Sequence, residues 1–238
     1  RIALKRIVGA YCILLIDQAD QVIGCSVLVE KLFNQLIGSK YVTFQSAIDT
    51  QYIDQCLTEI RPKSGNKKRI VSSGTLCYRK GLDLFLEVSN FCKGEDFEFL
   101  WLGKWPNNGY AELLKIKIKA GEFPKVQILD QLNHQEYYQT MQSADLFLSC
   151  SREESMGLVM MEAIYCGVPV LATDSGGSSL IVNDQNGKVC FDFRPETLSQ
   201  EIQGLLNRPF EKLAMRKSIS QYDGELEIQK LEIILSKI

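Results

Sequence analysis

The segment DLFLSCSREESMGLVMMEA, residues 145–163, carries the strongest structural signal in the chain. Its opening residues, Asp145 to Ser149, form a short apolar run that predicts a strand buried on both faces. A polar loop follows, and the apolar stretch from Gly157 to Tyr165 then predicts a helix. A buried strand that leads through a loop into a helix is the repeating unit of a doubly wound α/β fold.

The same alternation extends over most of the chain after residue 68. Further β-branched or aromatic runs predict strands at 69–73, 97–102, 126–129, 168–172 and 188–191. Helices are expected at 82–91, 110–120 and 135–142, and later from Pro195, Glu211 and Glu225. Because the strands are apolar on both faces, helices must cover both faces of the sheet. The predicted fold class is therefore α/β, with a doubly wound, Rossmann-like parallel sheet.

The segment RPKSGNKK, residues 61–68, predicts a boundary, because it is polar and rich in Pro, Gly and Lys. Before it, two strands and one helix are expected, at 21–25, 41–44 and 27–36. Residues 1–60 hold too few strands for a domain, so we expect them to be the tail of one. The absence of an initiating Met fits an excerpt of a longer chain. Residues 61–238 are expected to form the second domain.

The amino-terminal run Ile7 to Ile16 follows three cations and looks like a signal peptide. No small-x-small cleavage site follows it, and Asp17 and Asp20 come at once. The run is also too short to span a bilayer. We therefore expect a buried amphipathic helix there.

Charge and cysteine content exclude two classes of function. The 238 residues contain 27 Lys and Arg against 29 Asp and Glu, so no basic field is expected to hold nucleic acid. The eight cysteines form no C-x-x-C pair and do not gather around the single histidine, His134, so no zinc site is expected. Most of them lie in apolar stretches, which is typical of reduced cysteines and predicts a cytoplasmic protein.

The first candidate binding segment is SGTLCYRKG, residues 73–81, which follows the strand at 69–73. In an open parallel sheet, ligands bind beyond the carboxyl ends of the strands. Gly74, followed by Thr75, lets the backbone approach a ligand, and Arg79 and Lys80 can neutralise phosphate oxygens. Taken alone, an ordinary turn with solvated cations explains this segment equally well.

The second candidate segment follows the strand at 145–149. Ser155 is expected to be the N-cap of the next helix, with Glu154 in the loop and Glu162 about two turns into the helix. The two carboxylates can accept hydrogen bonds from hydroxyls of one elongated anionic ligand. The helix-start amides expected to face its phosphates are those of Met156, Gly157 and Leu158.

The alternative for this segment is a charged helix start with Glu162 on a solvated face. Apolar residues on both sides of Glu162, at 158–161 and 163–165, speak against that alternative, because they show no solvent-facing pattern.

Several ordered motifs together resemble a known family. Glu154 and Glu162 have seven residues between them, and GVPV at 167–170 and Gly176-Gly177 follow. This pattern resembles the E-x7-E signature of the family 4 retaining glycosyltransferases of the GT-B type. The family's "AD.F..PS" strand, "KG", "AD.VI..S" and "NGID" segments are matched at 144–149, 79–81, 19–23 and 47–49. The resemblance runs from about residue 15 to residue 192.

The resemblance implies transfer of a sugar from a nucleoside diphosphate, UDP or GDP, to an acceptor with the anomeric configuration retained. Glu154 is then the catalytic residue and contacts the donor sugar, Glu162 binds the ribose hydroxyls, and Lys80 clamps the diphosphate. Amides of the loop from Ser155 to Leu158 assist. No metal and no cofactor are implied, because cations and helix amides carry the charge of the leaving group.

The resemblance also assigns the two parts of the chain. Residues 1–60 become the tail of an N-terminal acceptor-side domain and its linker, and residues 61–238 become the C-terminal donor-binding domain with its terminal helices. A saccharide, a lipid-linked sugar or another small molecule is the expected acceptor. Any peripheral membrane contact is expected from the missing part of the N-terminal domain, and the 238 residues alone are expected to be inactive.

The sequence departs from the family at several positions. Thr75 stands where the family usually has an arginine, and Leu180 stands where it has an acidic residue; Ser46-Ala47 replaces its "NG". His134 lies between a strand and a helix, so we expect it at the surface and not as the family's amino-terminal histidine.

Two other classes of function are alternatives to transfer. Thr75 and Leu180 keep open a nucleotide-binding module, or a degenerate transferase that binds without turnover. A dehydrogenase-like domain is set aside, because no G-x-G-x-x-G follows Ser73 and GKW at 103–105 occupies the end of the second strand.

Overall fold

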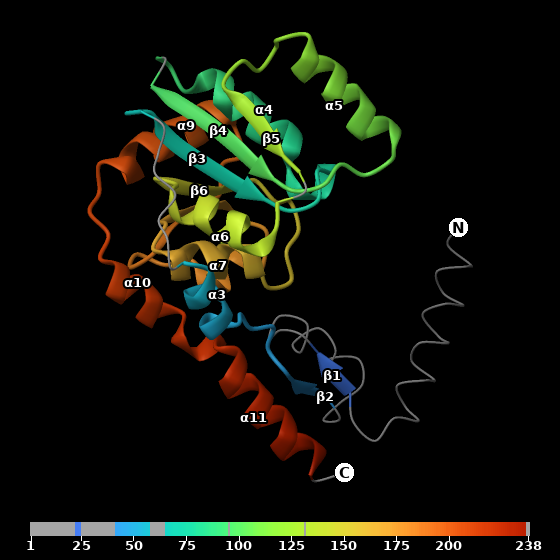
Figure 1. Ribbon diagram of the computed structural model, residues 1–238, viewed down its shortest axis with the longest axis vertical. Coiled ribbons are helices and arrows are strands. Elements are labelled where there is room, and N and C mark those ends of the chain that lie inside the picture. The colour runs from blue at the N-terminus through green and yellow to red at the C-terminus, as the bar shows by residue number, and fades with distance from the viewer. Residues whose placement is uncertain (1–21, 25–40, 58–64, 95, 131, 237–238) are drawn as a thin grey trace.

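The computed structural model describes residues 22–24, 41–57, 65–94, 96–130 and 132–236. Six parallel strands form one sheet in the order β5-β4-β3-β6-β7-β8 (Figure 1). They are β3 (Lys68–Ser73), β4 (Phe97–Leu102), β5 (Val126–Leu129), β6 (Leu146–Ser149), β7 (Val170–Thr173) and β8 (Gly187–Cys190). Each lies within two residues of its predicted bounds, and the doubly wound α/β fold class is confirmed.

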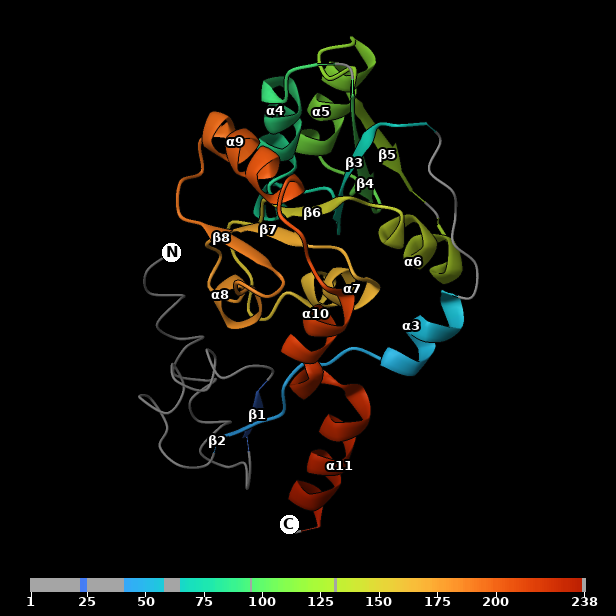
Figure 2. The ribbon, with the colours of Figure 1, turned by 90° about the vertical axis from the view of Figure 1, so that its left-hand side faces the viewer.

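Helices cover both faces of this sheet, as Figures 1 and 2 show. One face carries α4 (Leu82–Phe91), α5 (Gly109–Lys119) and α9 (Pro195–Leu206). The other carries α6 (His134–Gln142), α7 (Leu158–Cys166) and α10 (Lys212–Ser218). The remaining elements of this part are η2 (Tyr78–Lys80), α8 (Ser178–Ile181), η3 (Ser220–Tyr222) and α11 (Gly224–Leu235).

Alternation along the strands divides the apolar core into two layers. On β3, Ile70 points into the layer beneath α4 and α9, and Val71 points into the layer beneath α6 and α7. On β4, Trp101 and Leu102 divide in the same way. All four side chains are almost completely buried, so both faces of the sheet need helical cover, as the apolar pattern predicted.

The strand order reverses between β3 and β6, which pair through Ile70 with Leu146 and Val71 with Phe147. The chain runs outward from β3 to β5, then crosses back and runs outward from β6 to β8. At such a reversal, loops leave neighbouring strands in opposite directions and a crevice forms beyond the carboxyl ends. The segments that follow β3 and β6 are the two candidate binding segments.

Residues 45–57 pack against α6 and α7 and against the start of α11. The helix α3 (Thr50–Cys56), which the sequence did not predict, begins where the Asp49 side chain accepts a hydrogen bond from Tyr52 N. It packs on α6 and α7. Ile48 pairs with Asp223, and Gln45 N donates to Glu227 Oε2 at 3.0 Å. These contacts tie the segment ahead of β3 to the start of α11.

A second sheet pairs β1 (Val22–Gly24) with β2 (Tyr41–Thr43) in parallel, and both strands were predicted. The helices predicted at 7–16 and 27–36 lie outside the described residues, as does part of the segment 61–68, so the division of the chain there stays a prediction. Across the described ranges, no helix is both long enough and apolar enough to cross a membrane.

Candidate functional site

The loops after β3 and β6 touch each other at Gly81 and Cys150. Gly81 has a left-handed φ of 72°, and a Cβ placed on it would lie 1.9 Å from the carbonyl oxygen of Cys150. Only glycine fits both the backbone conformation and this close approach. The start of α4 therefore lies directly against the loop that holds Glu154.

Glu154 and Lys80 form an ion pair in the crevice between these loops. Lys80 Nζ donates to Glu154 Oε1, and Ser151 Oγ donates to the same oxygen at 2.8 Å. Arg79 Nη1 lies 4.0 Å from the other carboxylate oxygen. The side chains of Glu154 and Lys80 are only 9% and 14% exposed, so solvent screens the pair weakly. The structure thus brings together three residues that the sequence placed in two separate segments.

The double glycine after β7 supports the loop that carries Glu154. Glu154 N donates to Ser175 O at 2.8 Å, and Gly177 N donates to Glu154 O at 2.8 Å. A Cβ on Gly177 would lie 2.7 Å from Met156 N. Because Gly177 has no side chain, the loop packs directly against this turn. The two hydrogen bonds then hold the backbone of Glu154.

The predicted N-cap of α7 is wrong. Gly157 occupies the N-cap position with a φ of 86°, and α7 begins at Leu158, whereas Ser155 is exposed two residues earlier. Met156, between them, is buried with 3% of its surface exposed. The apolar anchor of Met156 and the left-handed turn at Gly157 delay the helix start past the serine.

Glu162 lies on the inner side of α7 and is held by two tyrosines of α6. The Tyr137 hydroxyl donates to Glu162 Oε2 at 2.8 Å, and the Tyr138 hydroxyl donates to Oε1 at 3.1 Å. The Tyr137 hydroxyl also lies 3.0 Å from Ser73 Oγ, at the carboxyl end of β3. Glu162 therefore lies against α6 with both carboxylate oxygens hydrogen-bonded, and the solvated-face alternative is wrong.

Tyr137 and Tyr138 were not predicted to take part in the site. They follow the capped start of α6, where Asn133 Oδ1 accepts from Glu136 N at 2.9 Å and Glu136 Oε2 accepts from Asn133 N at 3.0 Å. This capping box sets the first turn and so the direction of both rings. The residues of the capping box can be recognised in the sequence. The contact of the two tyrosines with Glu162 cannot, because it depends on how α6 packs on α7.

A cavity of about 310 Å³ opens beyond the carboxyl ends of β3, β4 and β5. Gly74 and Thr75 contribute one side of it. Trp101 Nε1 donates to Gly74 O at 2.8 Å, and a Cβ on Gly103 would lie 2.0 Å from the same oxygen. The other lining residues are Ser73, Leu102, Gly103, Lys104, Leu129, Leu132 and Tyr137. Aliphatic and aromatic walls of this kind suit a flat ring.

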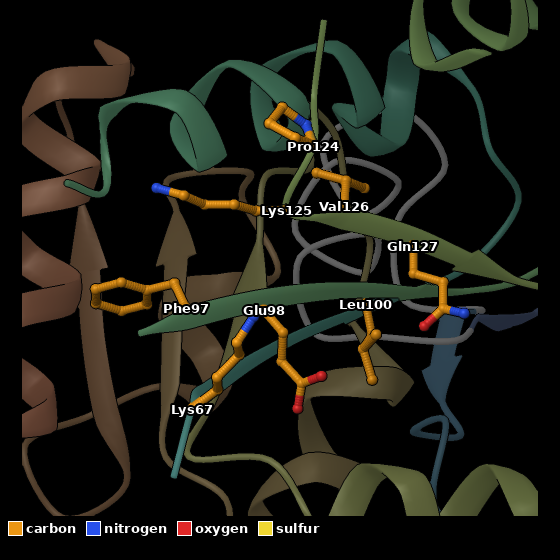
Figure 3. A pocket seen from close by; sticks show the side chains of 8 residues that line it. All are labelled: Lys67, Phe97, Glu98, Leu100, Pro124, Lys125, Val126 and Gln127. Carbon is orange, nitrogen blue, oxygen red and sulfur yellow. The ribbon is translucent and has the colours of Figure 1, made fainter. Parts of the chain in front are cut away.

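A larger concavity, of about 590 Å³, lies elsewhere on β4 and β5 (Figure 3). Its lining includes Lys67, Phe97 and Val126, which stand at the amino ends of β3, β4 and β5. Ligands of open parallel sheets bind at the opposite end of the strands. The paired charges of Lys80 and Glu154 also lie in the carboxyl-end crevice, which we take as the candidate site.

Three other groups of residues that the sequence analysis named are His134, the cysteines and Leu180. His134 is exposed at the start of α6, as expected, with Nδ1 3.1 Å from the Tyr52 hydroxyl. Within the described ranges, six cysteines are all free thiols, and no group of three or more His, Cys, Asp or Glu side chains is placed to hold a metal ion. Leu180 lies on α8 and is 38% exposed.

Comparison with known sequences identifies relatives of this chain. The sequence model of the family described as glycosyl transferases group 1 matches residues 57–223. A GDP-mannose-dependent monoacylated alpha-(1-6)-phosphatidylinositol monomannoside mannosyltransferase of Corynebacterium glutamicum is 34% identical over 155 residues, 61% of this chain and 40% of that protein. The sulfoquinovosyl transferase SQD2 of Arabidopsis thaliana is 30% identical over 182 residues, 72% of this chain and 34% of that protein. The matched part of the chain thus spans well under half of either relative.

Comparison with solved structures shows the same fold. A glycosyltransferase from Rickettsia africae superposes with a TM-score of 0.80 and 19% identity, over 96% of this chain and 66% of that one. Anabaena HepE in complex with UDP and glucose superposes with a TM-score of 0.78 and 19% identity, over 96% of this chain and 66% of that one. Both likenesses confirm the GT-B type of Rossmann-like domain.

Proposed function

Because the chain belongs to the group 1 glycosyl transferases, we propose that it binds a nucleoside-diphosphate sugar between the loops after β3 and β6, for retaining transfer to an acceptor. Two arrangements at the strand-order reversal carry the proposal: the ion pair of Lys80 with Glu154, and the link from Glu162 through Tyr137 to Ser73 at the end of β3. The Anabaena neighbour was solved with UDP and glucose, and the Corynebacterium relative is named for GDP-mannose. Both are consistent with a nucleoside-diphosphate donor.

The geometry suggests how the donor's parts are shared among the residues. We propose that Glu162, which Tyr137 links to Ser73 at the carboxyl end of β3, accepts the ribose hydroxyls, and that the cavity beside Gly74 and Thr75 takes the base. Lys80 and Arg79 supply the positive charge for the diphosphate, assisted by the amides of residues 155–158. Glu154 is ion-paired with Lys80, and we therefore assign it to the donor sugar beside the proposed diphosphate position.

The proposed reaction requires that the donor and acceptor be held in position and that the negative charge of the departing diphosphate be stabilised. The bond from the anomeric carbon to the diphosphate breaks, and a bond to an acceptor hydroxyl forms on the same face of the sugar. The hydroxyl proton passes to an oxygen of the departing diphosphate, on which negative charge grows. Lys80, Arg79 and the helix-start amides can stabilise that charge without a metal ion. We propose a saccharide, a lipid-linked sugar or another small molecule as the acceptor, and a cytoplasmic location consistent with the free cysteines.

A second candidate function is binding without turnover. Thr75 stands where the resemblance leads one to expect an arginine, which removes one cation from the phosphates, and Leu180, 38% exposed, stands where it leads one to expect an acid. Donor-dependent turnover by the complete protein separates the two candidates, because a binding module saturates with donor and releases no nucleoside diphosphate.

Titration calorimetry tests the binding step directly. We expect the 238-residue chain to bind UDP or GDP saturably, and Lys80→Met to weaken that binding because the diphosphate loses its nearest ammonium. Lys188→Met is the matched control. Lys188 lies on the outer strand β8, where it pairs with Glu201. The proposal fails if no nucleoside diphosphate binds at millimolar concentration, or if the two variants bind alike.

The affinity is also expected to depend on pH. Burial raises the pKa of Glu162 above its ordinary value of 4.5, and the hydroxyls of Tyr137 and Tyr138 only partly offset the rise. Protonation removes a charged acceptor from the ribose, so affinity for UDP or GDP should fall as the pH drops towards the raised pKa of Glu162.

Protonation of Glu162 is expected to affect the stability of the fold in the opposite direction, so its effects on affinity and on stability can be separated. A raised carboxyl pKa means that protonation favours the folded state, so this group should not lower the melting temperature over the same pH range. The Glu162→Gln variant should show no such fall in affinity. An equally steep fall in that variant would assign the pH dependence to another group.

A further inference from the structure

Arg152 lies in the loop after β6 and has no part in the proposed function so far. Its guanidinium binds Asp83 in a bidentate manner, with Nη1 2.9 Å from Oδ1 and Nη2 2.8 Å from Oδ2. Asp83 stands in the first turn of α4, next to the loop that carries the phosphate-binding cations. The ion pair therefore links the loop after β6 to the first turn of α4, which follows the loop after β3.

Arg152 also holds the backbone of η2, the turn that carries Arg79 and Lys80. Its Nη1 donates to Tyr78 O at 2.7 Å, and its backbone N donates to Arg79 O at 2.8 Å. The guanidinium carbon lies 3.8 Å from the centre of the Tyr78 ring. In return, Arg79 Nη1 donates to Glu153 O at 3.1 Å. The two loops are bound to each other at four points by these contacts.

Tyr110 of α5 fixes the other side of this arrangement. Its hydroxyl donates to Asp83 Oδ1 at 3.1 Å, and Asp83 N donates to that hydroxyl at 3.3 Å. The rings of Tyr110 and Tyr78 meet edge to face, with centres 6.2 Å apart. Asp83 is therefore held by Tyr110 as well as by Arg152.

We propose that Arg152 is a positioning residue, which holds η2 so that Lys80 and Arg79 face the donor diphosphate without itself contacting the donor. Its Nη atoms are already engaged by Asp83 and Tyr78 O, and the Tyr78 ring covers one face of the guanidinium. A displacement of about 1 Å in a binding group is enough to lower affinity or rate substantially. This inference rests on the proposed function, because it concerns the same crevice.

The test compares Arg152→Lys, Asp83→Asn and the double variant by titration with UDP or GDP, whichever binds the unsubstituted chain. We expect each single variant to bind about tenfold more weakly, since lysine cannot make the bidentate and stacked contacts and asparagine loses the charge. The double variant should be no weaker than either single one, because both remove the same arrangement. Arg194→Lys is the control, as Arg194 binds Asp192 in an exposed pair.

The alternative outcomes are distinct. If Arg152 contacts phosphate directly, Asp83→Asn releases its guanidinium, and that variant binds as tightly as the unsubstituted chain or more tightly, which overturns the inference. A fall in melting temperature with unchanged affinity in both single variants assigns Arg152 to stability alone and also overturns it. Failure of the unsubstituted chain to bind either nucleotide refutes the proposed function itself, and the inference with it.

Discussion

Replacement of Glu162 by glutamine is expected to weaken the binding of UDP or GDP and of the nucleotide sugar by the same factor. The ribose is common to both ligands, and its hydroxyls would lose a charged acceptor. Hydrogen bonds to charged groups contribute about 1.5–3 kcal/mol, which corresponds to about 10- to 150-fold in affinity. Glutamine keeps an oxygen for one of the tyrosine hydroxyls, so the fold should be retained.

The matched variant is Glu154→Gln, because Glu154 is assigned to the donor sugar. Glutamine can still accept from Lys80 and from Ser151, so affinity for the bare diphosphate should change little. In the complete protein, turnover with the full donor should fall, since the charge that orients the sugar is gone. Equal losses for the bare diphosphate in both variants would refute the division of roles. An unchanged affinity in Glu162→Gln would refute the ribose assignment.

Replacement of Gly81 by alanine is expected to destabilise the fold by about 2–5 kcal/mol and to abolish nucleotide binding under conditions where the chain stays folded. The left-handed conformation costs an alanine about 1–2 kcal/mol, and forcing atoms into a packed region adds about 1–3 kcal/mol. The second cost arises because the new Cβ would stand 1.9 Å from Cys150 O. Denaturant unfolding measures the sum.

Gly121→Ala separates the two costs. Gly121 has a similar φ of 79°, and a Cβ placed on it would meet no atom within 4 Å. We expect this variant to show only the backbone cost, with nucleotide affinity unchanged. Equal destabilisation in the two variants would show that the loops can move apart at Gly81 without cost, and that their contact does not hold the site together.

The sheet was predictable because each strand has a local signal. Runs such as Phe97 to Leu102 are apolar on both faces, and only a strand between two helical layers buries them completely. The helix α3 was missed because its seven residues are mostly polar, and only Ile53 and Cys56 are buried. What makes it a helix is its Asp49 cap and its packing on α6 and α7, and the packing depends on residues far away in the chain.

The residues of the candidate site also include some that were named from the sequence and some that were not. Glu154, Glu162 and Lys80 were named from the sequence motifs, and their roles stay predictions. The structure pairs Lys80 with Glu154 and links Glu162 through Tyr137 to Ser73. Arg152 lay within the same segment but received no role, since its partner Asp83 is 69 positions away. Ser155 was wrongly expected to be the helix N-cap, because burial of the neighbouring Met156 outweighs the local preference of serine.

The position of the crevice has a consequence for how the chain acquires its ligand. Lys80 and Glu154 are 74 positions apart and meet only after β3 pairs with β6. Non-local strand pairing of this kind is slow, because the chain between the strands must be ordered first. A partly folded chain with only one half of the sheet has one half of the site, so donor binding selects the completed fold. The donor should accordingly raise the free energy of unfolding of the whole sheet as its concentration exceeds its dissociation constant, about 2.7 kcal/mol at a hundredfold excess.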